Sequence, residues 1–169
     1  MAASSIPGKK PKGKPGEKLQ ILFSPEIPAL SVPHRRLLES LAHAVTATHA
    51  VDGQVQLILS GDEYLRHLNA TYRGQNKVTD VLSFDLARAS DPAIPGIDPI
   101  GGEIYLSLPR AQAQAEEYQV PLIAELARLL VHGLLHLAGY EHDTPDKLRF
   151  MERETDRFLQ AAGLQPVPP

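Results

Sequence analysis

The chain has 169 residues, is 43% hydrophobic and carries a formal net charge of -3 at pH 7. This length and apolar content suit a single globular domain with one core, and the weak negative charge does not indicate a general nucleic-acid binder. Cysteine is absent, which excludes disulfides and thiolate metal sites, so a metal would have to be held by imidazole or carboxylate groups.

The first segment in chain order is a Lys-, Pro- and Gly-rich tail. Residues 1–18 cannot bury a core and are predicted to be disordered. They lack the apolar region of a secretory signal, and no later segment is long and apolar enough to span a bilayer, so we expect a cytoplasmic protein without membrane contact. Residues 19–23 predict a strand and residues 34–48 a helix. His43 and His49 have no partner at ligand spacing and are predicted to lie on the surface.

The next segments predict a strand, a helix and a second strand. Residues 54–59 alternate polar with apolar side chains and then run apolar, which is typical of a strand entering a core. Residues 60–63 predict a capping box that begins a helix through Leu68. We expect this helix to deliver residues 72–74 (Tyr-Arg-Gly) to a loop before a strand over 81–84.

The middle of the chain contains a Pro-rich segment. Residues 87–101 contain three prolines and lack the periodicity of either element, so they predict a mobile loop, with a plain connection favoured over a lid. A strand is predicted over 103–106 and a polar helix over 110–118.

The last predicted helix begins at Thr144 and Pro145, as N-cap and first helical residue, and ends at Gly163. The predicted domain therefore spans residues 19–164, and residues 165–169 are predicted to be a flexible C-terminal tail. Four short strands interspersed with about five helices predict an α+β, α/β-like single domain.

Three histidines at positions one, five and eleven form the most informative pattern of the chain. An aliphatic, buried helix is predicted over 121–131 and leads into His132; His136 lies four residues on, on the same face. Gly139 can end the helix in a left-handed turn, after which His142 can complete a triangle of nitrogens. Three protein ligands leave one position open, as in catalytic zinc sites, so the first two histidines are also predicted to be catalytic. Zinc is the default ion, with nickel or another divalent metal as alternatives.

The same histidine spacing occurs in the zinc proteases called metzincins, which place a glutamate general base directly after the first histidine. Gly133 stands at that position and can neither take nor give a proton. A zinc metallopeptidase is therefore the second hypothesis, and a ribosome-associated binding factor with a structural metal is the third.

The segment 132–142 resembles the YbeY family of bacterial rRNA maturation factors, which are metal-dependent endoribonucleases. Residues 68–74 and 79–84 look like another signature of that family, and residues 102–104 (Gly-Glu-Ile) stand where it usually has Gly-Asp-Ile. The resemblance covers residues 19–164. It implies a small mixed sheet and cleavage of single-stranded RNA, in maturation of the 3′ end of small-subunit ribosomal RNA and in ribosome quality control. The implied partners are ribosomal RNA, the small ribosomal subunit and ribosome-assembly proteins.

Within this hypothesis Arg73 neutralises charge on the nonbridging phosphate oxygens. Spacing alone would favour a surface salt bridge for Arg73; the resemblance to a family whose matching arginine is functionally important favours the catalytic role. The general acid or base stays open among Glu141, Asp143 and Glu103, and Glu141 is expected instead to accept the free N–H of a metal-bound imidazole. The attacking oxygen stays open between hydroxide and the ribose 2′-hydroxyl.

Overall fold

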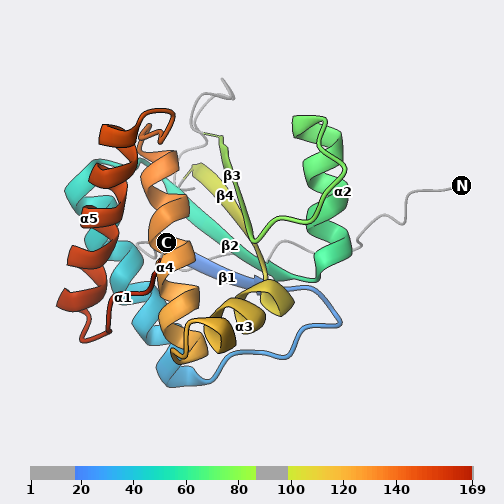
Figure 1. Ribbon diagram of the computed structural model, residues 1–169, viewed down its shortest axis with the longest axis horizontal. Coiled ribbons are helices and arrows are strands. Elements are labelled where there is room, and N and C mark those ends of the chain that lie inside the picture. The colour runs from blue at the N-terminus through green and yellow to red at the C-terminus, as the bar shows by residue number, and fades with distance from the viewer. Residues whose placement is uncertain (1–17, 87–98, 169) are drawn as a thin grey trace, which may run out of the picture.

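A four-stranded sheet with five helices packed around it makes up the computed structural model, which describes residues 18–86 and 99–168 (Figure 1). This confirms the predicted α+β single domain with a small mixed sheet. The elements, in chain order, are β1 (Leu19–Phe23), α1 (Val32–His49), β2 (Gln54–Ser60), α2 (Asp62–Arg73), β3 (Val81–Asp85), β4 (Ile100–Ser107), α3 (Leu108–Glu117), α4 (Leu122–Leu137) and α5 (Pro145–Ala161).

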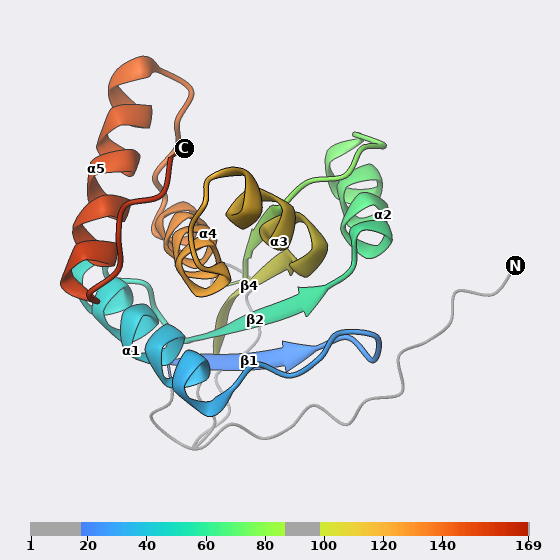
Figure 2. The same ribbon diagram turned by 60° about the horizontal axis from the view of Figure 1, so that its bottom comes forward.

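The sheet has the order β1-β2-β4-β3, in which β3 is an edge strand that runs antiparallel to β4 while the other pairs are parallel. Side chains alternate between its two faces. One face carries Leu57 and Ile104, both fully buried in the main core with α1 and α4. On the other face, Tyr105 and Phe84 meet the rings of α2. Both views show α2 standing apart from α1, α4 and α5 (Figure 1 and Figure 2).

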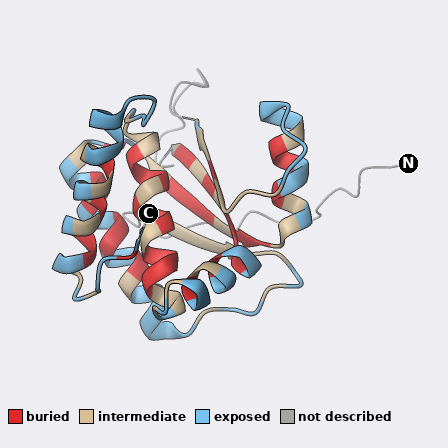
Figure 3. Cartoon of the chain, viewed as in Figure 1, coloured by how far each residue is buried: buried red, intermediate tan, exposed pale blue. Residues whose placement is uncertain are grey.

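Helix α4 forms the centre of the core because apolar residues occupy almost its whole circumference. Ten of its sixteen residues are buried, and Figure 3 shows it red along most of its length. Among the described residues no single helix is long and apolar enough to cross a membrane; α3 and α4 meet that test only as a pair that bends by 117°.

Two local predictions in the region of α2 are wrong. The capping box does not form, because Ser60 belongs to β2 and its hydroxyl bonds the hydroxyl of Ser24 at 2.7 Å, while Gly61 is the N-cap without a side-chain bond. The helix also continues past Leu68 through Arg73, so this arginine lies on its last turn and not in a loop. Gly74 ends the helix with φ +66°, a conformation that glycine adopts without strain.

The boundaries of the other elements differ less from the predicted ones. The predicted loop over 87–101 is shorter at its end, because β4 begins at Ile100. Residues 87–98 of this loop, and residues 1–17 of the tail predicted over 1–18, lie outside the described residues. Thr144 caps α5 as predicted, accepting from the Lys147 N–H, and Gly163 follows the end of that helix with φ +75°. In the C-terminal segment predicted to be flexible, Val167 is only 5% exposed and packs on the core.

Candidate metal centre

The three histidines converge as the sequence predicts. His132 and His136 lie one turn apart on α4, and Gly139, with φ +91°, reverses the chain so that His142 returns to them. One ring nitrogen from each histidine lies within 4.8 Å of the others. Two nitrogens bound to one tetrahedral zinc are about 3.3 Å apart, so this donor set fits a divalent ion after small movements of the rings.

Hydrogen bonding fixes which nitrogen of His136 faces the centre. Its Nδ1 lies 2.9 Å from the carbonyl oxygen of Tyr140, which can only accept, so Nδ1 carries the proton and Nε2 has the free lone pair. That Nε2 lies 3.0 Å from the Nε2 of His132. The acceptor for this imidazole is therefore the carbonyl of Tyr140, and the prediction that Glu141 takes this role is wrong for His136.

Burial keeps the helical histidines in the neutral form that binds metals. Burial and the charges of the neighbouring histidines lower the pKa of His132 to about 4. Burial also lowers the pKa of His136, assisted by the charge of His142. Since a proton competes with a metal for the same lone pair, these lowered pKa values favour metal binding near neutral pH.

The metal-free protein should lose stability in mild acid because of His132. Between its ordinary pKa of 6.5 and its folded pKa of about 4, the unfolded chain binds more protons at this residue than the folded chain, so lowering the pH favours unfolding. The contribution is full above pH 6.5 and is lost as the pH falls through this window, by roughly 3 kcal/mol at most. Urea unfolding of chelated protein at several pH values measures it. A His132→Gln variant with an equally steep pH dependence would contradict the assignment.

His49 supports the turn that carries Tyr140, and the prediction that it lies on the surface is wrong. Its side chain is 7% exposed, with Nδ1 3.2 Å from the Tyr140 hydroxyl and Nε2 2.9 Å from the Glu154 carboxylate. These partners lie more than ninety residues away in the chain, so no local spacing reveals them. His43 is exposed, as predicted.

Arg73 lies at the end of α2, and its guanidinium is one of the charges that, after burial and His142, lower the pKa of His136. The side chain is exposed, and within residues 18–86 and 99–168 no carboxylate forms an ion pair with it. The surface salt bridge, which was the alternative for this residue, is therefore not found in the described part of the chain. Arg73 remains available to an anion that approaches the histidines.

The three carboxylates predicted as the general acid or base lie in different surroundings in the fold. Glu103 lies on the face of β4 opposite to α4, where it accepts a hydrogen bond of 2.9 Å from the Tyr105 hydroxyl, so it is excluded as the general acid or base. Asp143 is exposed and pairs with Lys147 at 2.7 Å. Glu141 is exposed and its charge acts on His136. The last two carboxylates flank the histidines and stay candidates.

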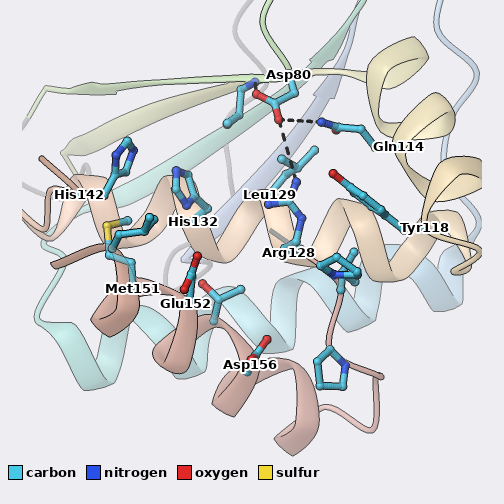
Figure 4. Close-up of a pocket in the computed structure, with 16 residues that line it drawn as sticks. Asp80, Gln114, Tyr118, Arg128, Leu129, His132, His142, Met151, Glu152 and Asp156 are labelled. Carbon is cyan, nitrogen blue, oxygen red and sulfur yellow. Dashed lines mark hydrogen bonds and ion pairs between the residues drawn. The ribbon is translucent and has the colours of Figure 1, made fainter. Parts of the chain in front are cut away.

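A cleft that the sequence did not predict opens beside the histidines. It has a volume of about 600 Å³ and runs along α4 from His132 and His142 toward the C-terminal segment (Figure 4). Its charged and polar walls come from the loop before β3, from α3 and its C-cap, from α4 and from α5; they include Asp80, Gln114, Tyr118, Arg128, Glu152 and Asp156.

Arg128 is the only arginine or lysine that lines this cleft within the described residues, and its charge is already neutralised. Arg128 donates two hydrogen bonds, of 2.8 and 2.6 Å, to the fully buried carboxylate of Glu125. An acid and a base three residues apart in an otherwise aliphatic helix were the sequence signal for this buried pair. Asp80 lies 4.0 Å from the Arg128 guanidinium and accepts a hydrogen bond from Gln114. The wall carboxylates without a described ion pair are Glu152 and Asp156, which give the cleft an excess of negative charge.

Gly133 faces the sheet, not the histidines. A Cβ atom built there would lie 2.9 Å from Cγ2 of Ile104 and 3.0 Å from Oγ of Ser83. The position that carries the general base in metzincins therefore has no room for a side chain in this protein. The peptidase hypothesis lacks both the catalytic group and the space for it.

Replacing Gly133 with alanine should lower the free energy of unfolding. Overpacking of a core contact costs about 1–3 kcal/mol, whereas alanine gains only about 1 kcal/mol over glycine in a helix. Glutamate at this position should be worse, because it would also bury an unpaired charge. Urea unfolding of both variants measures the effect, and an alanine variant more stable than the parent would show that α4 and β4 are less tightly packed than described.

Comparison with known proteins agrees with the histidine pattern. The sequence model of a family described as Endoribonuclease YbeY matches residues 27–163. A protein of that description from Anaeromyxobacter sp. is 38% identical over 86% of this chain and 73% of its own length. Another, from Moorella thermoacetica, is 42% identical over 76% of this chain and 88% of its own length. The solution structure of a Thermotoga maritima protein matches with a TM-score of 0.55 at 24% identity, covering 85% of this chain and 90% of its own, which supports the fold.

Proposed function

The chain belongs to the YbeY family of endoribonucleases, and on this basis we propose that it is a metal-dependent endoribonuclease that cleaves single-stranded RNA. The observation that carries the proposal is the convergence of His132, His136 and His142, with an unpaired Arg73 whose charge reaches them. We propose these three histidines as the metal ligands. Zinc is the proposed ion, because three nitrogen donors suit it; nickel or another divalent metal is the alternative.

The residues around the histidines have distinct roles in the proposed reaction. A divalent ion held by His132, His136 and His142 would supply acidification of water and polarisation of a phosphoryl oxygen. Arg73 places a guanidinium against the nonbridging oxygens as negative charge accumulates on them. The carbonyl of Tyr140 holds His136 with Nε2 directed at the centre. Glu141 or Asp143 accepts or returns the proton of the attacking group, which is a water or the ribose 2′-hydroxyl.

The cleft favours a single strand over a duplex. Its volume of about 600 Å³ lies within the usual range for ligand pockets, and it opens at the histidines, so it can receive one unstacked nucleotide beside the phosphate being cleaved. Because Glu152 and Asp156 line the cleft without a described ion pair, the phosphates stay outside and the base enters. A base paired within a duplex cannot reach such a recess.

We place this activity in the cytoplasm, in maturation of the 3′ end of small-subunit ribosomal RNA and in ribosome quality control. Resemblance to the rRNA maturation factors supports this context. The proposed partners are the small ribosomal subunit and ribosome-assembly proteins.

Cleavage assays separate the three hypotheses. The protein should cut single-stranded RNA and leave duplex RNA and casein intact; a chelator should abolish cutting, and added zinc should restore it. Digestion of casein would instead support the peptidase. Binding of RNA without any cutting, together with loss of the fold on chelation, would support the binding factor with a structural metal.

A further inference from the structure

The geometry points to Tyr72 as a platform on which a base of the RNA stacks beside the metal centre. This inference rests on the proposed function, because it names how the same site holds its substrate. It adds a binding residue that is neither a metal ligand nor a charged group.

The ring of Tyr72 is exposed and yet fixed in orientation. It is 67% exposed, the most exposed large apolar side chain in the described part of the chain. It meets the ring of Phe84 on β3 in an edge-to-face contact, with centroids 5.2 Å apart and an interplanar angle of 65°. Phe84 in turn contacts Tyr105, which contacts Tyr64 on α2. A ring supported from one side presents its free surface to a ligand at little cost in conformational entropy.

Two cations without an ion pair among the described residues follow this ring in the chain. Arg73 is the next residue, and Lys77 follows in a turn that the buried Asn69 holds by donating a 2.9 Å hydrogen bond to the carbonyl of Lys77. Both cations are exposed, and neither forms an ion pair with any residue in 18–86 or 99–168. An aromatic ring with cations close to it in the chain is an arrangement by which proteins bind single strands, since phosphates meet the charges while a base stacks on the ring.

The edge strand β3 sets where Tyr72, Arg73 and Lys77 lie relative to the three histidines. α2 and α4 pack on opposite faces of the sheet, and both contact β3. Their C-terminal ends lie at the same side of the molecule, with β3 between them (Figure 1). A strand of RNA that crosses this edge can place one base on Tyr72, its phosphate at Arg73 and the histidines, and the next base in the cleft.

A single tryptophan reports the stacking directly. The chain contains no tryptophan, so a Tyr72→Trp variant has one fluorophore at the proposed platform. Metal-loaded protein is mixed with an oligoadenylate hexamer in a stopped-flow instrument, which records fluorescence before cleavage proceeds. We expect rapid quenching by the hexamer and none by an abasic phosphodiester of the same length. A Val32→Trp variant, whose site is 53% exposed at the start of α1, is the matched control and should stay unquenched.

Steady-state kinetics of Tyr72 variants measures how much the stacking contributes to RNA binding. Tyr72→Ala should raise KM for single-stranded RNA about 10- to 100-fold with kcat nearly unchanged, and Tyr72→Phe should stay within about twofold of the parent. Absence of quenching, or equal quenching by the abasic chain, would overturn the platform even if RNA is cleaved normally. Quenching by the hexamer in a protein that cuts no RNA would overturn the proposed function and leave the platform standing.

Discussion

Replacing Arg73 with glutamate should lower RNA cleavage by at least about 100-fold and leave the fold and metal content unchanged. A single well-placed donor to a developing oxyanion is worth about 10²–10³ in rate, and the glutamate adds repulsion of the phosphate. The fold should tolerate the change because the side chain is exposed and holds no described ion pair. Single-turnover kinetics on a labelled RNA, with metal analysis of the same samples, measures both quantities.

The matched control lies on the same helix. Arg66 is also an exposed arginine of α2, but it pairs with Glu63 at 2.8 Å and lies seven residues before Arg73, away from the end of the helix. Arg66→Glu should therefore cleave at the parental rate. Arg73→Lys should fall between the parent and Arg73→Glu, because lysine keeps the charge and loses the planar fork. Normal cleavage by Arg73→Glu would remove this arginine from the mechanism.

Replacing His136 with alanine should abolish both metal binding and cleavage. This residue supplies the central nitrogen of the trio, with its Nε2 3.0 Å from that of His132 and its Nδ1 held by the Tyr140 carbonyl. Loss of one of three ligands leaves two, and even loss of a supporting hydrogen bond typically costs 10- to 100-fold in metal affinity. We expect a decrease of more than about 100-fold in affinity and no measurable cleavage at equimolar metal.

His43→Ala is the control for this prediction, because that histidine is exposed on α1 and outside the trio. It should bind metal and cleave RNA like the parent. A His136→Ala protein that keeps one tightly bound metal ion would show that the ion is held elsewhere.

The convergence of the three histidines could be predicted because their geometry is set by nearby residues in the chain. Residues four apart on a helix share a face, and a glycine with positive φ reverses the chain; both features follow from the spacing of His132, His136 and Gly139. The number of strands and helices followed from periodicity for the same reason. The end of α2 was missed because nothing before Gly74 in the sequence stops a helix.

What the sequence could not reveal depends on contacts between distant segments. Alternation along β4 indicates that Glu103 and Ile104 face opposite sides, but only the packing of α4 on Ile104 decides that the acid points away from the histidines. The burial of His49 and the cleft likewise arise where helices far apart in the chain meet. The crowding at Gly133 also depends on contacts between distant segments, because a Cβ there meets side chains of two strands.

Titration of metal-free protein with zinc, with bound metal and RNA cleavage measured on the same samples, shows whether the ion at the three histidines carries the activity. We expect cleavage to rise in proportion to bound metal and to reach its maximum at about one ion per chain, as for one site with three protein ligands. Full cleavage by protein without metal, or one tightly bound ion with no cleavage of single-stranded RNA, would contradict it.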